Sequence, residues 1–435
     1  MSYVPNRHLC PEPWQRMLVD LRGDVVPCCA RRWNDTFGNI KHQRWQDIWN
    51  GEAYQKLRAE MRESGYEKTC PDCELIKTQG IPPVCLKEET LDGPQDYTKN
   101  GRLFLKEFSE ARTVLESTCI HLTIFPSGKC NLQCIQCAQR LGDLRKNSLG
   151  ESSLQLILDL LPTLDMLCLS GGEPMVQKEY TYCIENIEKF KHLTLSMSTN
   201  GILLDDEQLQ HIHKFKGCDI GISVDAGSRQ VYEKVRRGNW DILYNNILNI
   251  SQNKKDDPRF FFAGSYTINK LNVLDLCNYI TMCMSLQMSS CFYSIEYFPP
   301  DLRPDIFCNV DEETRGWEKI FDEALCLAEK FDNACFPKAF STEGQYTMLP
   351  SLKEYVGRIL RGIERASLYK PREFSFGKAF ARKFVVIVHS ETNEHLAYGY
   401  CDDLGKVTIR VPSDSYSAKI YDDRYVAQRL GLFHF

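Results

Sequence analysis

Residues 130–137 read CNLQCIQC and place three thiols, those of Cys130, Cys134 and Cys137, within one short stretch. The stretch follows CIHLTIF (119–125), whose apolar and β-branched residues are typical of a buried strand. The intervening SGK predicts a turn. We therefore expect the thiols in a loop at the carboxyl end of a strand, where parallel α/β sheets carry their chemistry. The alternative, three cysteines on one buried face of a helix, fits this turn less well.

Strand-like and helix-like segments alternate after this point in the chain. The β-rich runs lie at 166–170, 193–199, 219–225, 259–268 and 291–298, and the helix-like stretches lie near 152–161, 179–190, 205–215, 228–252 and 273–286. Strands separated by helices of this length indicate right-handed βαβ crossovers and a parallel sheet. We therefore expect an α/β protein with a partial (β/α)6 barrel of the TIM type, because a complete eight-fold barrel would need two more units.

The chain is expected to divide into four zones. These are a cysteine-rich zone with a helical pattern at 1–90, a polar linker at 91–118, the partial barrel at 119–304, and a C-terminal extension of unknown role at 305–435. Helical patterns in the extension lie at 311–333 and 351–366. Strand-like runs from residue 384 onward predict a small antiparallel β unit after them.

The composition is that of an ordinary globular protein. The 435 residues are 43% hydrophobic and carry a net charge of −5, so there is no overall basic surface for nucleic acid. The locally basic stretch 353–383 fits a solvated helix face, and the alternative is a surface that receives an acidic leader peptide or a phosphorylated sugar. The first twenty residues lack the apolar core of a signal peptide, and no stretch is long enough to cross a bilayer. We therefore expect a cytoplasmic protein that binds neither membranes nor nucleic acid.

In a reducing compartment, clusters among the 20 cysteines predict metal or redox chemistry rather than disulfides. Cysteines within apolar patterns, such as Cys168 and Cys183, are expected to be small buried hydrophobic residues. The trio at 130–137 is different. Iron-sulfur clusters are held by cysteine thiolates, ideally four for each cubane, so three thiols leave one iron open to a chelating small molecule.

Glycines or polar residues mark the ends of the next strands. LSGGEP supplies Gly171, Gly172 and Glu173, STNG supplies Ser198 and Asn200, ISVDA supplies Ser223 and Asp225, and YEKVRRG adds Arg236 and Arg237. Taken singly, such residues are usually turns or caps. Together they form a constellation at one rim of the sheet, where glycines let a ligand approach the backbone and polar groups can bond to it.

In this order and spacing, CxxxCxxC, GGEP, STNG and SVDA resemble the radical S-adenosylmethionine (SAM) superfamily over residues 119–300. The resemblance implies that Cys130, Cys134 and Cys137 hold a 4Fe-4S cluster, whose unique iron is chelated by the amino and carboxylate groups of SAM. The family usually has an aromatic residue just before the third cysteine, and this chain has Gln136 there. Adenine stacking from that position is therefore not implied.

The same resemblance gives roles to the strand ends. Gly171, Gly172 and Glu173 would receive the methionyl ammonium group. Ser198 and Asn200, with Ser223 or Asp225, would meet the ribose or the carboxylate of SAM. Arg236 or Arg237 could offset the carboxylate charge.

The N-terminal zone has a second cysteine pattern, with Cys10, Cys28 in a G-x4-C context, and Cys70 and Cys73 in CPDC. With FGNI and IWNGEAYQKLR between them, these residues resemble the SPASM or shorter twitch module of the same superfamily, which binds auxiliary iron-sulfur clusters and usually follows the barrel. The resemblance implies one auxiliary 4Fe-4S cluster held by these four thiols. Cys29 could replace Cys28, and Cys85 could replace a missing ligand. A four-cysteine zinc ribbon is the alternative.

The resemblance implies a radical SAM enzyme that receives an electron from a flavodoxin- or ferredoxin-like donor, cleaves SAM and abstracts hydrogen from an unactivated C–H bond. The expected outcome is oxidation or crosslinking of a peptide or protein side chain, with the auxiliary cluster as electron relay. One alternative is a dehydrogenase or epimerase that acts on a sugar, aminocyclitol or other small molecule, and another is a non-catalytic zinc-ribbon interaction protein. No catalytic side chain is identified, since Tyr266, Tyr293, Glu296 and Tyr297 at the ends of the last strands are more often packing residues.

Overall fold

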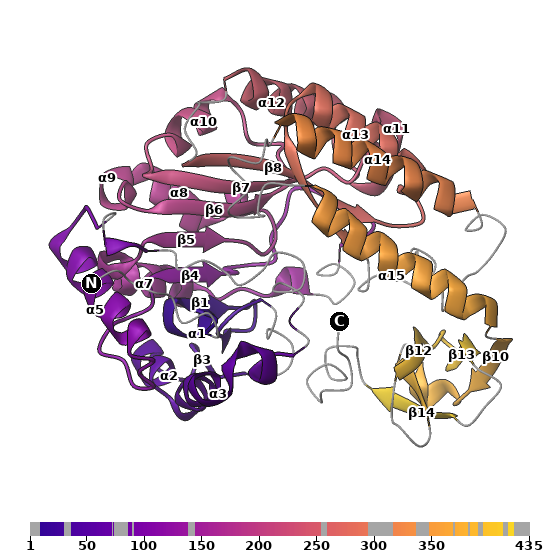
Figure 1. Ribbon diagram of the computed structural model, residues 1–435, viewed down its shortest axis with the longest axis horizontal. Helices are drawn as coiled ribbons and strands as arrows, with labels where there is room; N and C mark the ends of the chain where they lie inside the picture. Colours follow the sequence, from indigo (N-terminus) through magenta and orange to yellow (C-terminus); the bar gives the residue numbers. More distant parts are fainter. Residues whose placement is uncertain are drawn as a thin grey trace. The chain divides into compact units, whose positions relative to one another are not determined.

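The computed structural model describes residues 9–29, 36–71, 73, 86–88, 91–137, 144–253, 259–294, 316–335, 348–368, 370–381, 383–389, 395–411 and 416–421 (Figure 1). The chain divides into two compact units. The first contains Met1–Gln133, Gln139–Ser223 and Ile242–Ala263, and the second contains Cys134–Ala138, Val224–Asp241 and Gly264–Phe435. The second unit therefore takes in the short segment that carries Cys134 and Cys137.

The first unit is built on a sheet in the strand order β3-β2-β1-β4-β5-β6-β7-β8 (Figure 1). The strands are β1 Arg16–Val19, β2 Asp24–Val26, β3 Gly38–Asn39, β4 His121–Ile124, β5 Met166–Leu169, β6 Thr194–Thr199, β7 Gly217–Ser223 and β8 Phe260–Ile268. Strands β1, β4, β5, β6 and β7 run parallel to one another, whereas β2 is antiparallel to both β1 and β3. The predicted α/β class with a parallel sheet is confirmed, and the described strands form an open sheet, as expected of a partial barrel.

Helices follow the strands as the predicted βαβ units require. They are α7 Glu151–Leu160, α8 Lys178–Glu185, α9 Ile187–Phe190, α10 Asp206–Ile212, α11 Arg229–Val235 and α12 Trp240–Gln252. The single helix expected over 228–252 is in fact α11 and α12, because Arg237 has a left-handed backbone (φ 56°) and Gly238 follows it. The helix expected over 179–190 is likewise divided at Asn186.

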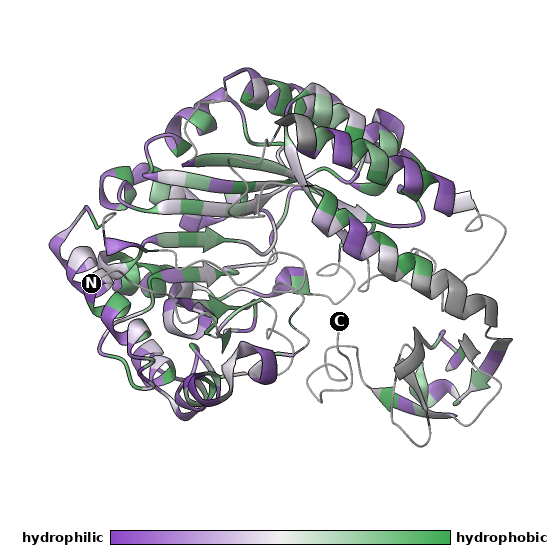
Figure 2. Ribbon diagram, viewed as in Figure 1, coloured by the Kyte–Doolittle hydropathy of each residue, from purple (hydrophilic) through white to green (hydrophobic). Residues whose placement is uncertain are grey.

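Alternation of side chains along the strands separates the two faces of the sheet. In β6, Leu195, Met197 and Thr199 are buried, whereas Ser196 is partly exposed and Ser198 is exposed. Figure 2 shows the corresponding mixture of hydrophobic and hydrophilic residues along the strands. One face therefore supplies apolar core, and the other is free to carry polar chemistry.

The N-terminal zone contributes directly to this sheet, which the sequence did not predict. Its helices are α1 Glu12–Gln15, α2 Trp45–Trp49 and α3 Glu52–Thr69, and β1 of this zone lies parallel to β4 with Leu18 opposite Thr123. The segment interpreted as a polar linker contains α5 Gln95–Ser109, which buries Tyr97, Phe104 and Phe108. The signal for β1 was weak because the strand is only four residues long.

The second unit holds β9 Ser289–Ser294, which follows β8 in sheet order, and the helices α13 Leu276–Ser285, α14 Trp317–Cys335 and α15 Leu349–Leu368. Beyond them, β10 Lys370–Ser375 pairs with β13 Lys406–Val411, and β11 Phe384–His389 lies between β12 His395–Tyr400 and β14 Tyr416–Tyr421. All these pairs are antiparallel, so the predicted antiparallel β unit is confirmed. Within the described part of the chain, no helix combines the length and apolar character needed to cross a membrane.

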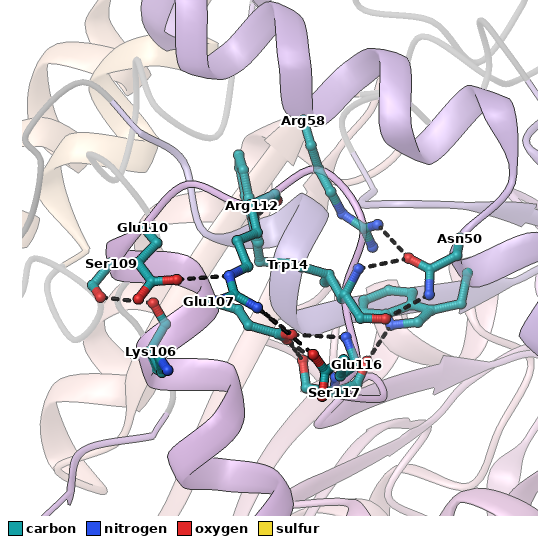
Figure 3. A network of polar contacts seen from close by, with 12 residues as sticks. Trp14, Asn50, Arg58, Lys106, Glu107, Ser109, Glu110, Arg112, Glu116 and Ser117 are labelled. Atoms are coloured by element: carbon teal, nitrogen blue, oxygen red, sulfur yellow. Dashed lines mark hydrogen bonds and ion pairs between the residues drawn. The ribbon is translucent and has the colours of Figure 1, made fainter.

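Buried side chains tie the N-terminal helices to the loop that leads into β4 (Figure 3). Arg58 of α3 is fully buried and donates to the carbonyl oxygens of Pro13 (2.9 Å) and Thr113 (3.1 Å). Its guanidinium also donates to Oδ1 of Asn50 at 3.3 Å, and that oxygen accepts from the backbone N–H of Leu115 at 2.9 Å. The loop is therefore held by side-chain bonds to its backbone groups.

Glu107 of α5 supplies the second part of this network. Its buried carboxylate accepts from the backbone N–H groups of Glu116 (2.7 Å) and Ser117 (3.1 Å) and from the hydroxyl of Ser117 (2.6 Å). Trp49 donates through Nε1 to the carbonyl of Ser117 at 2.8 Å. Because buried polar groups are costly when unpaired, each of these bonds helps to fix the entry of the chain into β4.

We expect Arg58→Met to lower the free energy of unfolding by about 3 kcal/mol, because the buried carbonyls of Pro13 and Thr113 lose their donor. Urea unfolding followed by tryptophan fluorescence would measure the loss. Arg62→Met on the exposed side of the same helix is the matched control and should change stability by less than about 0.5 kcal/mol. Equal stability of the two variants would contradict this account.

Candidate functional site

The GGEP segment lies against the residues that precede the first cysteine of the trio. The N–H of Gly172 donates to the carbonyl of Ser127 at 2.9 Å, and the N–H of Glu173 donates to the carbonyl of Lys129 at 2.8 Å. A Cβ atom at position 172 would lie 1.9 Å from the Lys129 carbonyl oxygen, which no side chain tolerates. Gly171 has a left-handed backbone (φ 111°). Both glycines are therefore needed for this backbone contact.

The carboxylate of Glu173 joins the end of β5 to the end of β6. It is almost fully buried, and it accepts from the hydroxyl of Thr199 (2.7 Å), the N–H of Asn200 (2.7 Å) and the N–H of Met175 (3.2 Å). Both carboxylate oxygens are engaged with protein donors. Glu173 thus contacts Lys129 through its backbone N–H, while its carboxylate bonds to residues at the end of β6.

Asn200 holds the first cysteine from the end of β6. Its Nδ2 donates to Oδ1 of Asn131 at 2.7 Å and lies 4.0 Å from Sγ of Cys130. Its own Oδ1 accepts from the N–H of Ile202 at 3.1 Å. The sulfur of Cys130 also accepts from the N–H of Leu132 at 3.4 Å. The structure therefore brings together Cys130, Asn200 and the GGEP segment, as the sequence suggested.

A separate set of contacts surrounds Asp225, at the end of β7. Its buried carboxylate accepts from the N–H of Thr267 (2.6 Å), from Nε2 of Gln136 (2.5 Å) and from Nη1 of Arg236 (3.0 Å). Burial raises the pKa of Asp225, and the charge of Arg236 opposes that change. Asp225 and Arg236, which were both expected to contact SAM, thus bond to each other. Asp225 also bonds to Gln136, which the sequence identified only as a departure from the family pattern.

Ser198 and Ser223 are placed differently. Ser198 is exposed and Ser223 is partly exposed at the ends of β6 and β7. Ser198 lies opposite Gly221, whose missing side chain leaves space beside the Ser198 hydroxyl. Their hydroxyls are open to a ligand in a way that the carboxylates of Glu173 and Asp225 are not. Tyr266 is a buried packing residue and Tyr293 is exposed, whereas Glu296 and Tyr297 lie outside the described residues.

A row of polar residues crosses the first unit on one face of its sheet. Strand register places Thr123 of β4, Cys168 of β5, Ser196 of β6 and Asp219 of β7 directly beside one another. Cys168 is only partly buried and hydrogen bonds with the Ser196 and Thr123 hydroxyls, so the expected buried hydrophobic cysteine is wrong in this case. Burial raises the pKa of its thiol, which therefore stays protonated at neutral pH. The alternation of polar residues in these strands was the signal that could have revealed this row.

An arginine extends the polar face on β1. Both Nε and Nη2 of Arg16 lie close to Nδ1 of His121, at 3.3 and 3.2 Å, and Nε pairs with the carboxylate of Glu12 at 2.9 Å. Burial, together with the charge of Arg16, lowers the pKa of His121 well below its usual value. Neighbouring atoms displace part of the hydration of the Asp219 carboxylate and raise its pKa, and the charge of Arg16 opposes that change. This face can therefore offer a polar molecule both charged and neutral hydrogen-bonding groups.

The N-terminal cysteines lie within electrostatic range of one another. The pKa of Cys10 is raised well above its usual value, chiefly by burial and then by the charges of Glu12, Cys28 and Cys73. The N–H of Cys73 donates to the carbonyl of Cys70 at 3.1 Å. Over the ranges that the structure describes, no three His, Cys, Asp or Glu side chains meet at metal-ligand distance. The donor set fits an iron-sulfur cluster by its chemistry; Cys29 is exposed, and Cys85 lies outside the described residues.

Comparison with known proteins finds two families. Residues 124–277 match the radical SAM superfamily, and residues 10–74 match SPASM, an iron-sulfur cluster-binding domain. Fe-coproporphyrin III synthase of Methanosarcina barkeri is 25% identical over 261 residues, covering 57% of this chain and 63% of that protein. A probable GTP 3',8-cyclase of Methanococcus aeolicus is 26% identical over 197 residues, covering 43% of this chain and 61% of that protein. The chain thus spans less than two thirds of these relatives.

Two solved structures of low sequence identity match parts of the chain. Streptococcus suis SuiB bound to its precursor peptide SuiA has a TM-score of 0.38 and 13% identity, and the match covers 72% of this chain and 69% of that one. The structure of anSMEcpe with bound AdoMet and the Cp18Cys peptide has a TM-score of 0.36 and 16% identity, covering 51% and 61%. The two matching families confirm the expected cofactors, a 4Fe-4S cluster with SAM and an auxiliary iron-sulfur cluster. Residues 124–277 thus carry a radical SAM domain, and residues 10–74 ahead of it carry a SPASM domain.

Proposed function

We propose that this radical SAM enzyme oxidises or crosslinks a peptide or protein side chain. When bound, SAM and a cluster held by Cys130, Cys134 and Cys137 would supply the radical chemistry that removes a hydrogen atom from an unactivated C–H bond. A net oxidation also releases a proton and a second electron, and an auxiliary cluster held by Cys10, Cys28, Cys70 and Cys73 would supply the electron acceptor. A flavodoxin- or ferredoxin-like protein is the electron donor in this proposal.

The observation that carries the proposal is the backbone contact between the GGEP segment and the cysteine loop. Gly172 and Glu173 bond to Ser127 and Lys129, just before Cys130, so a ligand of a cluster on Cys130 would lie close to this segment. We assign the cluster to Cys130, Cys134 and Cys137 and the methionyl ammonium group to the backbone of residues 171–173. The open hydroxyls of Ser198 and Ser223, with Asn200, are assigned to the ribose or the carboxylate.

A small-molecule substrate is the second candidate, because the curated relatives have names of that kind. Fe-coproporphyrin III synthase and the probable GTP 3',8-cyclases are named for small molecules. The SPASM domain at 10–74 supports the peptide candidate, because the SPASM proteins that this sequence resembles commonly modify peptides. Genes beside this one would separate the two, since a short precursor peptide encoded there could be incubated with the enzyme, SAM and reductant. Loss of a pair of hydrogen atoms, seen by mass spectrometry, would support peptide oxidation; an unchanged peptide would favour the small molecule.

Replacing Cys130, Cys134 and Cys137 together by alanine should lower the iron content of anaerobically purified protein from about eight to about four atoms per chain. It should also abolish release of 5'-deoxyadenosine from SAM in the presence of dithionite, because the open iron is lost. Cys326→Ala, which removes an exposed thiol of α14, is the control and should change neither quantity. Release of 5'-deoxyadenosine by the triple variant would refute the proposed site.

Replacing Cys10, Cys28, Cys70 and Cys73 together by serine should also remove about four irons, but it should leave the SAM-dependent change in the electron paramagnetic resonance (EPR) spectrum of the first cluster. Cys29→Ser should retain all the iron if Cys29 is a spare thiol. Metal analysis decides between the auxiliary cluster and a zinc ribbon. Loss of about one zinc, with iron unchanged, would establish the zinc ribbon instead.

A further inference from the structure

Gln136 lies between the second and third thiols of the cysteine loop, and both ends of its side-chain amide are bonded. Nε2 donates to Oδ2 of Asp225 at 2.5 Å, and Oε1 accepts from Nδ2 of Asn269 at 2.8 Å. The side chain is only 4% exposed. Nothing about the position resembles a surface glutamine, and Gln133 three residues earlier is exposed.

The acceptor of this bond is itself fixed from several sides. Asp225 has a left-handed backbone (φ 57°), and its second carboxylate oxygen accepts from the N–H of Thr267 at 2.6 Å. Arg236 donates to the same oxygen as Gln136, at 3.0 Å. Nδ2 of Asn272 donates to the backbone carbonyl of Asp225 at 3.0 Å. Asp225 is therefore a rigid anchor at the end of β7, and Gln136 is attached to it.

The backbone next to Gln136 is held as well. The N–H of Ile135 donates to the carbonyl of Val235 at the end of α11, at 3.0 Å. The N–H of Cys137 donates to the carbonyl of Cys134 at 3.3 Å, which closes a turn between the two thiol-bearing residues. The turn is thus attached through the backbone N–H of Ile135 and through the side chain of Gln136.

We propose that Gln136 is a positioning residue for the cluster ligands Cys134 and Cys137, and that its side chain does not contact the adenine of SAM. The amide secures the turn to the Asp225–Arg236 pair, so that the two thiolates are held before iron binds. The proposal rests on the function proposed above. A phenylalanine side chain at this position could neither donate to Asp225 nor accept from Asn269, and these two bonds to the buried groups would be lost.

Gln136→Leu, which keeps similar volume and removes both bonds, tests the proposal with Gln133→Leu as the matched control. Loss of a partner that orients a metal ligand typically weakens metal binding by roughly 10- to 100-fold. We expect Gln136→Leu to raise the concentration of SAM needed for half of the EPR shift of the reduced cluster by a similar factor, and to lose iron faster to a chelator. Gln133→Leu should match the wild-type protein in both measurements.

A paired exchange separates positioning from general damage to the fold. Gln136→Glu places a second carboxylate beside Asp225 and should impair the cluster as Gln136→Leu does. In the double variant Gln136→Glu/Asp225→Asn, the amide at position 225 donates to the carboxylate at position 136, so the bond is restored with donor and acceptor exchanged. The carboxylate at position 136 then provides the negative charge near Arg236. The double variant should recover most of the iron retention and the SAM-dependent EPR shift, while retention of the auxiliary cluster reports that each variant is folded.

Several results would overturn the proposal. These are wild-type iron retention and SAM response in Gln136→Leu, tighter SAM binding in Gln136→Phe, or no recovery in the double variant. Absence of the radical SAM cluster from the wild-type protein would instead defeat the proposed function, and this inference with it. If the wild-type protein binds SAM and Gln136→Leu matches it in iron retention and in the SAM-dependent EPR shift, the positioning role is wrong and the proposed function stands.

Discussion

The contact between Gly172 and the carbonyl of Lys129 is the constraint on which the rest of the site depends. With 1.9 Å between that oxygen and a Cβ at position 172, only glycine lets the two loops meet, and two backbone hydrogen bonds then hold them. Glu173 and Asn200 extend the contact to the end of β6. The position of the first cysteine is thus set by strand ends of the sheet and not by the flexibility of its own loop.

The remaining cysteines are held by different strand ends. Cys130 is secured from β5 and β6, whereas the turn from Cys134 to Cys137 is secured through Ile135 and Gln136 to residues at the ends of α11 and β7. Ligands held before metal binding lose less conformational entropy when the metal arrives. The carboxylates of Glu173 and Asp225 accept hydrogen bonds from protein donors and help to hold these loops rigid. Ser198 and Ser223 are less buried and are open to a ligand.

The sequence predicted those features that are recorded locally. Runs of apolar and β-branched residues predicted β4 to β8, and the three thiols together with GGEP predicted the candidate site. It could not reveal bonds between residues far apart in the chain, such as Gln136 with Asp225, 89 residues away, or Arg16 with His121, 105 residues away. Strand β1 was missed because four residues are too few to show a period. Helix α5 was missed because its sequence is polar overall, and its few apolar residues form a stripe that is recognised only once their packing partners are known.

The position of β1 also bears on what the N-terminal domain can do. Cys10 precedes β1 by six residues. The hydroxyl of Tyr54 donates to the backbone carbonyl of Arg16 in β1 at 3.1 Å. Burial raises the pKa of Tyr54, and the nearby Cys28 thiol adds to that rise. Arg16 in turn contacts His121 on the polar face of the sheet. A domain attached only by a linker could change its distance from that face. This one is built into the same hydrogen-bonded sheet through the pairing of β1 with β4, so its strand β1 keeps a fixed position beside the polar face.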